Sequence, residues 1–126
     1  MTFSALAMDH FRAPRCVGSC AGNAPHVATS EAGSPAIGEV VRIQIAVKDG
    51  MVQQARMKVF GGVPAIAAAS WFCEWVEGRM VDDARAMDTP TIMRELDLPV
   101  ECARSVALVL DAAQAALARH GGGGKD

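Results

Sequence analysis

The stretch MKVFGGVPAIAAAS, residues 57–70, decides the fold. It begins with the end of an alternating strand pattern, and the next two residues, Gly61 and Gly62, favour a turn because glycine adopts backbone angles that other residues avoid. Pro64 suits the first turn of a helix, where no backbone N–H is needed. Such strand-to-helix turns often present a reactive side chain or bind an anion. The turn itself contains no Cys, Ser, His or Lys. It therefore predicts a strand-to-helix connection but offers no candidate catalytic side chain.

The chain before this stretch has the pattern of an antiparallel sheet. Residues 39–47 alternate between apolar and polar side chains, and residues 51–60 do so again. Between them, Asp49 and Gly50 provide the positive φ angles of a tight hairpin turn. We expect a loop at residues 12–25, a short edge strand at 26–29 and a second loop at 31–35. The prediction is a sheet with one apolar and one polar face.

The chain after Pro64 has helical periodicity. The first helix carries an apolar stripe and ends near Gly78; the stripe is Ile66, Ala69, Cys73 and Val76. Shorter helices are predicted at residues 80–87 and after Asp88, a long one at 100–119, and an N-terminal one at 4–11 capped by Ser4. Strands followed by helices indicate the α+β class: a small antiparallel three-stranded sheet with a helical layer on one face. We expect a single domain over residues 1–120 and a flexible Gly-rich tail at 121–126.

Composition narrows the function classes. The 126 residues are 51% hydrophobic, with a formal net charge of −2, which fits one domain with a real core and no broad basic surface for nucleic acid. No apolar run approaches the ~20 residues of a membrane helix. We therefore expect a cytoplasmic protein without direct membrane insertion, leaving open peripheral association with a membrane complex. The cysteines are expected to be reduced thiols.

Five short segments occur in a distinctive order: DHFRAPRCVG at 9–18, SPAIGE at 34–39, KVFGG at 58–62, EWVEG at 74–78 and LP at 98–99. Each is weak alone, but the ordered set resembles the IscU/NifU-type iron–sulfur cluster scaffold family. The resemblance extends over about residues 3–117. It implies the family's IscU/NifU N-terminal-like fold, an antiparallel sheet with a helical layer, in agreement with the pattern above.

The resemblance also implies a cluster site, from which this sequence departs. In the family, three cysteines and a nearby aspartate surround the nascent cluster. The cysteine positions here are Ile37, Gly62 and Ser105, the aspartate position is Glu39, and Arg104 replaces a histidine. Clusters are held by thiolates, and a fixed cation repels iron. We therefore expect a vestigial cluster site and no cofactor, with an iron–sulfur cluster or a single metal ion as the alternative.

The cysteines that remain leave alternatives open. Cys102 with Glu39 forms a candidate metal site, although two ligands fall short of the usual four, and a half-buried helix thiol is the simpler interpretation. Cys16 and Cys20 lie in one loop and are expected to be inert, with a disulfide or a metal pair as alternatives. Cys73 is expected to be a buried apolar side chain.

A second set of residues has candidate roles in binding a partner. Trp71 and Trp75 share a helix face that differs from the core stripe, so they either pack under the short helices or form an apolar patch. Leu98 and Pro99 begin an altered form of the family's chaperone-recognition motif. His10 belongs to the N-terminal signature and is expected to make local hydrogen bonds or to contact a partner.

The sequence thus predicts a non-catalytic protein that acts by docking on another protein. The partner is expected to be a larger complex or the cysteine desulfurase-type assembly machinery. The alternative is a working assembly factor that uses Glu39, Cys102 or a partner's thiols as ligands. An independent enzyme is disfavoured because Ser105 has no general base placed by the sequence.

Overall fold

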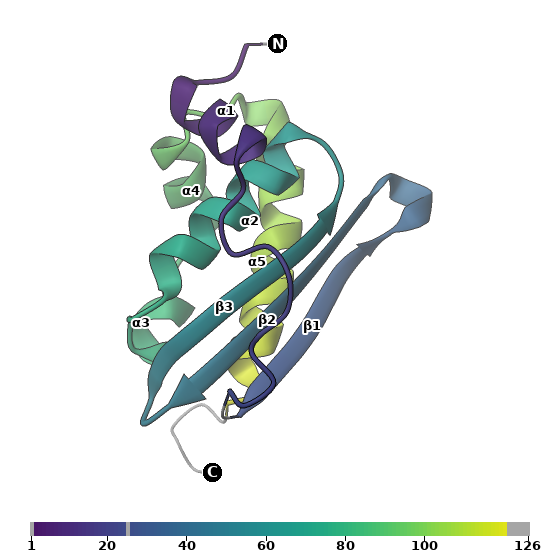
Figure 1. The fold of residues 1–126 in the computed structure, drawn as a ribbon. Coiled ribbons are helices and arrows are strands. Elements are labelled where there is room, and N and C mark those ends of the chain that lie inside the picture. Colours follow the sequence, from purple (N-terminus) through teal and green to yellow (C-terminus); the bar gives the residue numbers. More distant parts are fainter. Residues whose placement is uncertain (1, 25, 121–126) are drawn as a thin grey trace.

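A computed structural model describes residues 2–24 and 26–120 (Figure 1). The elements, in chain order, are α1 (Ala5–Arg12), β1 (Val27–Ser34), η1 (Pro35–Ile37), β2 (Glu39–Lys48), β3 (Met51–Phe60), α2 (Val63–Val76), α3 (Val81–Arg85), α4 (Thr89–Glu95), η2 (Val100–Cys102) and α5 (Ala103–Ala118), where η1 and η2 are 3-10 turns. The predicted tail at 121–126 lies outside the described residues.

The sheet has the predicted antiparallel order β1-β2-β3. The alternation along β2 is confirmed, because Val41, Ile43 and Ile45 are fully buried. The hairpin between β2 and β3 has the expected left-handed residues, with φ of 55° at Asp49 and 75° at Gly50. Local sequence therefore predicts the buried face of β2 as far as Ile45, beyond which an irregularity between Ala46 and Val47 shifts the register.

The first strand is longer than predicted. β1 runs through Ser34, which pairs with Glu39, so the expected loop at residues 31–35 is largely strand. Propensity missed it because Gly and Ser are poor strand formers, whereas pairing with β2 and packing on α5 decide the conformation. Small side chains suit this contact, since Ala28 is buried and Ala32 packs against the core.

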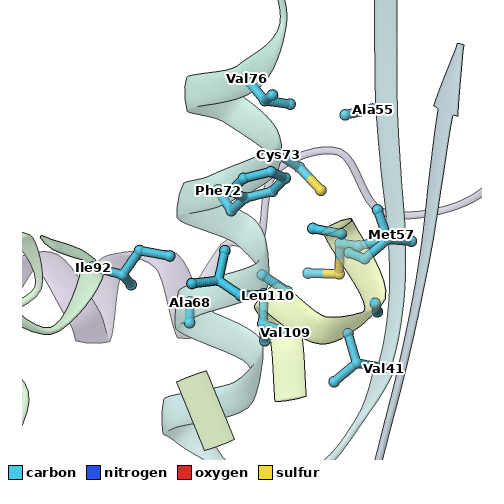
Figure 2. Close-up of a cluster of buried hydrophobic side chains, with 14 of the residues drawn as sticks. Val41, Ala55, Met57, Ala68, Phe72, Cys73, Val76, Ile92, Val109 and Leu110 are labelled. Carbon is cyan, nitrogen blue, oxygen red and sulfur yellow. The ribbon is translucent and has the colours of Figure 1, made fainter. Parts of the chain in front are cut away.

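The helical layer covers one face of the sheet, with α2 and α5 packed against it (Figure 1). Cys73 and Val76 of α2 lie opposite Ala55 and Met57 of β3 (Figure 2). The predicted stripe on α2 was too narrow, because the helix is also buried by α1 and α5. Phe72, outside the stripe, is fully buried, whereas Ile66, within it, is only half-buried.

Two helix caps are confirmed as predicted. The Ser4 hydroxyl accepts a hydrogen bond from the Ala7 N–H and donates one to the Leu96 carbonyl, which ties α1 to the end of α4. The Asp88 carboxylate accepts from the Thr91 N–H. The long C-terminal helix begins later than expected, because a 3-10 turn precedes α5 and contains Cys102.

Residues 13–24, here called the strap, cross the polar face of the sheet (Figure 1). Val17 forms a single parallel bridge with Met57 at the edge of β3. Farther along, the Cys20 N–H donates to the Gln44 side chain and the Ala21 N–H to that of Gln54. The predicted loop is therefore a segment fastened to β2 and β3 by polar contacts.

Candidate functional site at the loop end of the sheet

Three connections meet at one end of the sheet, which we call the loop end: residues 34–39, 60–63 and 100–105. The Ser105 hydroxyl, at the start of α5, donates a 2.5 Å hydrogen bond to Oε2 of Glu39, at the start of β2. The turn after β3 is equally close, since a Cβ added to Gly61 would lie 3.4 Å from Cγ of Glu39. The structure therefore gathers most of the residues that the resemblance assigned to a cluster site.

The side chains gathered here contain no thiol at the three expected ligand positions. Ile37 is 50% exposed and purely apolar. Gly62 is the N-cap residue of α2 and has no side chain. The Ser105 hydroxyl is already engaged with Glu39. A cluster needs thiolate or imidazole ligands, so these positions do not fit one.

Cys102 precedes α5 in the third of these connections and is only 3% exposed. Burial raises the pKa of its thiol, with smaller contributions from the negative charges of Glu101 and Glu39. A cysteine binds a metal ion as the thiolate, and this environment disfavours the thiolate form of Cys102. Within residues 2–24 and 26–120, no group of three or more His, Cys, Asp and Glu side chains is arranged to hold a metal ion.

Arg104 lies next to Ser105 in sequence, at the start of α5. Its residue is exposed, and within the described part of the chain no ion pair joins it to Glu39. The Glu39 carboxylate instead accepts a hydrogen bond from the Ser105 hydroxyl. The Arg104 charge remains in solvent.

The residues predicted to contact a partner have different environments. His10 is 2% exposed, with its Nδ1 2.7 Å from the Ser70 hydroxyl and its Nε2 3.8 Å from Oε1 of Glu74. Leu98 is buried and Pro99 is half-buried. His10 therefore forms a hydrogen bond with a residue 60 positions away and lies near a carboxylate, and the sequence analysis named neither of these neighbours.

The tryptophan pair lies on another surface. The Trp71 and Trp75 rings stack with centroids 6.0 Å apart and an interplanar angle of 10°. The Arg79 guanidinium lies 4.3 Å from the Trp75 ring centroid. Both rings are half-buried and pack against the core, so much of their area is already used within the chain.

Two exposed apolar residues at the loop end were missed by sequence reasoning. Phe60 is 65% exposed and Val100 is 80% exposed. For Phe60 a signal existed, because the alternation that buries Met57 directs Lys58 and Phe60 to the opposite face. Together with Ile37, they give the loop end exposed apolar side chains from three separate connections.

Comparison with known proteins identifies the family. The sequence profile of the NifU-like N-terminal domain matches residues 2–124. The chain belongs to the NifU-like N-terminal domain family. It is 40% identical over 121 residues to the iron–sulfur cluster assembly scaffold protein IscU of Escherichia coli K12, covering 95% of this chain and 94% of that protein. It is 38% identical to IscU of Haemophilus influenzae, covering 95% and 96%.

The structure agrees with this family assignment. The N-terminal domain of a nitrogen-fixing NifU-like protein from Brucella abortus superposes with a TM-score of 0.74 at 18% identity, covering 92% of each chain. The predicted α+β fold of the NifU-like N-terminal type is confirmed. Within the described part of the chain, no helix is both long enough and apolar enough to cross a membrane.

The expectation of no cofactor is corrected by these comparisons. Relatives that match nearly the whole chain are named iron–sulfur cluster assembly scaffold proteins, so a cluster is the group that membership in the NifU-like family implies. The described residues at the loop end nevertheless do not supply the ligands, since the three positions hold an alkyl group, a hydrogen and an engaged hydroxyl. No step through a cluster is derived from them.

Proposed function

We propose that this chain serves iron–sulfur cluster assembly by docking on another protein, without a three-thiolate cluster site of its own. The observation that carries this proposal is the loop end, where a hydrogen bond between Glu39 and Ser105 occupies the position expected for ligands. The cluster handled by the assembly is then held with thiols that a partner supplies. This role requires no catalytic step from the chain, and we propose it as a cytoplasmic one.

The docking surface in this proposal comprises Ile37, Phe60 and Val100, which are 50%, 65% and 80% exposed. Exposed aromatic and branched side chains release water when a partner covers them, and this supports binding. Pro99, half-buried beside Val100, limits backbone freedom and so reduces the entropy lost on docking. The partner class is cysteine desulfurase-type assembly machinery or a larger complex that contains it.

Cluster reconstitution tests the ligand part of the proposal. The wild-type chain and the triple variant Ile37→Cys, Gly62→Cys, Ser105→Cys are incubated anaerobically with iron, sulfide and a thiol reductant, then desalted and assayed for both elements. We expect the triple variant to retain more iron and sulfide per chain than the wild type, because thiolates have been returned to the three positions. Equal retention by the two proteins contradicts the proposal.

A second measurement distinguishes docking from the alternative function, that of a working scaffold with non-standard ligands. Its support is the proximity of Cys102 to Glu39, whose charge contributes to the raised pKa of that thiol. If the wild-type chain holds stoichiometric iron and the Cys102→Ser variant loses it, the chain is a working scaffold with non-standard ligands. If docking is correct, Cys102→Ser matches the wild type, whereas Phe60→Ser with Val100→Ser weakens co-purification of a desulfurase.

A further inference from the structure

The polar face of the sheet carries two cations between the strap and the loop end. The strap crosses this face (Figure 1) and is held there by the side chains of Gln44 and Gln54, on the side nearer the hairpin. Two positions nearer the loop end than Gln44 lies Arg42 of β2, and beside it lies Lys58 of β3. Lys58 is exposed and Arg42 is half-buried. Both side chains can therefore meet another molecule.

These two cations lie directly opposite each other. Arg42 and Lys58 are register partners in the pairing of β2 with β3, so their side chains leave the same face with their Cβ atoms about 5 Å apart. Like charges in this arrangement repel each other. Within residues 2–24 and 26–120, neither forms an ion pair. Glu31 of β1 is the other register partner of Arg42, but it is exposed and also forms no ion pair with a described residue.

A third cation of the same face is neutralised within the chain. Nη1 of Arg56 donates to Oε2 of Glu77 at 2.7 Å and to the Ala55 carbonyl at 2.7 Å. The same Glu77 oxygen accepts from the Ala55 N–H at 2.8 Å, which ties the end of α2 to β3. The fold therefore supplies a carboxylate to the cation under the strap, and none of the described carboxylates pairs with the two cations nearer the loop end.

The pair adjoins the docking surface. Lys58 and Phe60 are two positions apart on one face of β3, a separation of about 7 Å in an extended strand. Phe60 is 65% exposed, and its register partner Val40 is half-buried. The exposed charges of the loop end itself, Glu101 and Arg104, are one of each sign. The unpaired positive charge is thus concentrated on the sheet face beside Phe60.

A carboxylate between the two cations would relieve their repulsion and accept charge-assisted hydrogen bonds from both. We propose that the partner docks with an acidic segment, whose carboxylate lies between Arg42 and Lys58 and whose neighbouring apolar side chain covers Phe60. The inference rests on the proposed function, and it adds the polar sheet face and the charge of the partner's segment. Exposed ion pairs contribute modestly to affinity but speed and orient encounter. The cations therefore select the partner, while the apolar residues supply most of the binding.

Titration calorimetry with a purified cysteine desulfurase tests this surface. The wild-type chain is compared with the double variant Arg42→Gln, Lys58→Gln at about 50 mM and about 300 mM salt, since screening weakens exposed charge pairs. We expect the variant to bind about fivefold more weakly at the lower salt and nearly as the wild type does at the higher. Equal binding at the lower salt overturns the inference.

The matched control is Lys48→Gln with Arg85→Gln. Both residues are exposed, Lys48 at the hairpin end of β2 and Arg85 in α3, and the net charge changes by the same amount. This variant should bind as the wild type does at both salt concentrations. If it weakens binding as much as the double variant at residues 42 and 58, overall charge is responsible and the inference is overturned.

Two further measurements separate the remaining outcomes. The variant Phe60→Ser, Val100→Ser should bind weakly at both salt concentrations, because its loss is apolar. Absence of binding by the wild type overturns the proposed function and this inference with it. In urea, the midpoint of Arg42→Gln, Lys58→Gln should not fall, because a like-charge contact is removed; a lower midpoint would show that the cations serve the fold and would overturn the inference. Salt-dependent binding of single-stranded RNA or of a second copy of the chain at these residues, without the desulfurase, would do the same.

Discussion

The loop end differs in construction from the region where α1 and the start of the strap pack on Ser70 of α2, which we call the strap end. At the loop end, apolar side chains are exposed and one side-chain hydrogen bond, from Ser105 to Glu39, joins α5 to β2. At the strap end, Ser70 of α2 binds both the His10 ring and the Arg15 N–H, and all three lie close to the core. Polar side chains thus stabilise one end, while the other keeps surface available for contact. Substitutions should therefore affect stability at the strap end and binding at the loop end.

The largest stability effect is expected for Ser70→Ala. The Ser70 hydroxyl is fully buried, and its loss leaves both the Arg15 N–H and Nδ1 of His10 without their partner. One buried and one partly buried polar group left unpaired should lower the free energy of unfolding by about 2–4 kcal/mol. Urea unfolding measures this, with Ser105→Ala as the matched control at the loop end. A greater loss in Ser105→Ala would reverse the comparison.

Gly33, next to the loop end, is a position where both the backbone angle and a close neighbour constrain substitution. Gly33 has φ of 89°, and an added Cβ would collide with the Glu39 carbonyl oxygen. Gly33→Ala should therefore cost about 1–3 kcal/mol in thermal or urea unfolding. Gly38→Ala is the control, since its φ of 83° is similar but no atom lies within 4 Å of the added Cβ. Equal effects would show that backbone strain alone, without the collision, accounts for the loss.

The strap end should also respond to pH. Burial, followed by the charge of Arg15, lowers the pKa of His10 from its ordinary value of 6.5, although Glu74 and Asp9 oppose the shift. The folded state thus prefers neutral His10. Its contribution to stability is complete above pH 6.5 and declines as pH falls through the lowered folded-state pKa. Unfolding free energies from about pH 8 to pH 5 should decline more for the wild type than for His10→Gln. Parallel curves contradict this.

The smallest stability effect is expected for Val100→Ser. The side chain is 80% exposed, so unfolding should change by no more than about 0.5 kcal/mol. The same substitution should weaken partner binding, measured by co-purification or titration calorimetry with a desulfurase. A large stability loss with unchanged binding would show that Val100 serves the fold, and the two ends would then not differ as described.

Prediction from sequence succeeded where the signal is local. The hairpin at Asp49 and Gly50, and the caps at Ser4 and Asp88, each depend on residues within four positions of one another. The strand β1 was predicted too short because its conformation depends on pairing with β2 and packing on α5. Local propensity contains no term for those contacts, so the prediction ended where glycine and serine begin.

The candidate site, too, was predicted from the sequence only in part. The absence of cysteine at residues 37, 62 and 105 is readable from the sequence once the family resemblance is stated. The burial of Cys102 and the exposure of Val100 became clear only in three dimensions, because the 3-10 turn before α5 directs neighbouring side chains in opposite ways.

By itself, the sequence determined the α+β class, the buried faces of β2 and β3, the caps of α1 and α4 and the resemblance to cluster scaffolds, because periodicity and capping act over a few residues. The tertiary structure alone decided which polar groups meet. His10 reaches Ser70 across 60 positions, and Ser105 reaches Glu39 across 66. Such contacts follow from how helices pack on a sheet, and no local pattern encodes that packing.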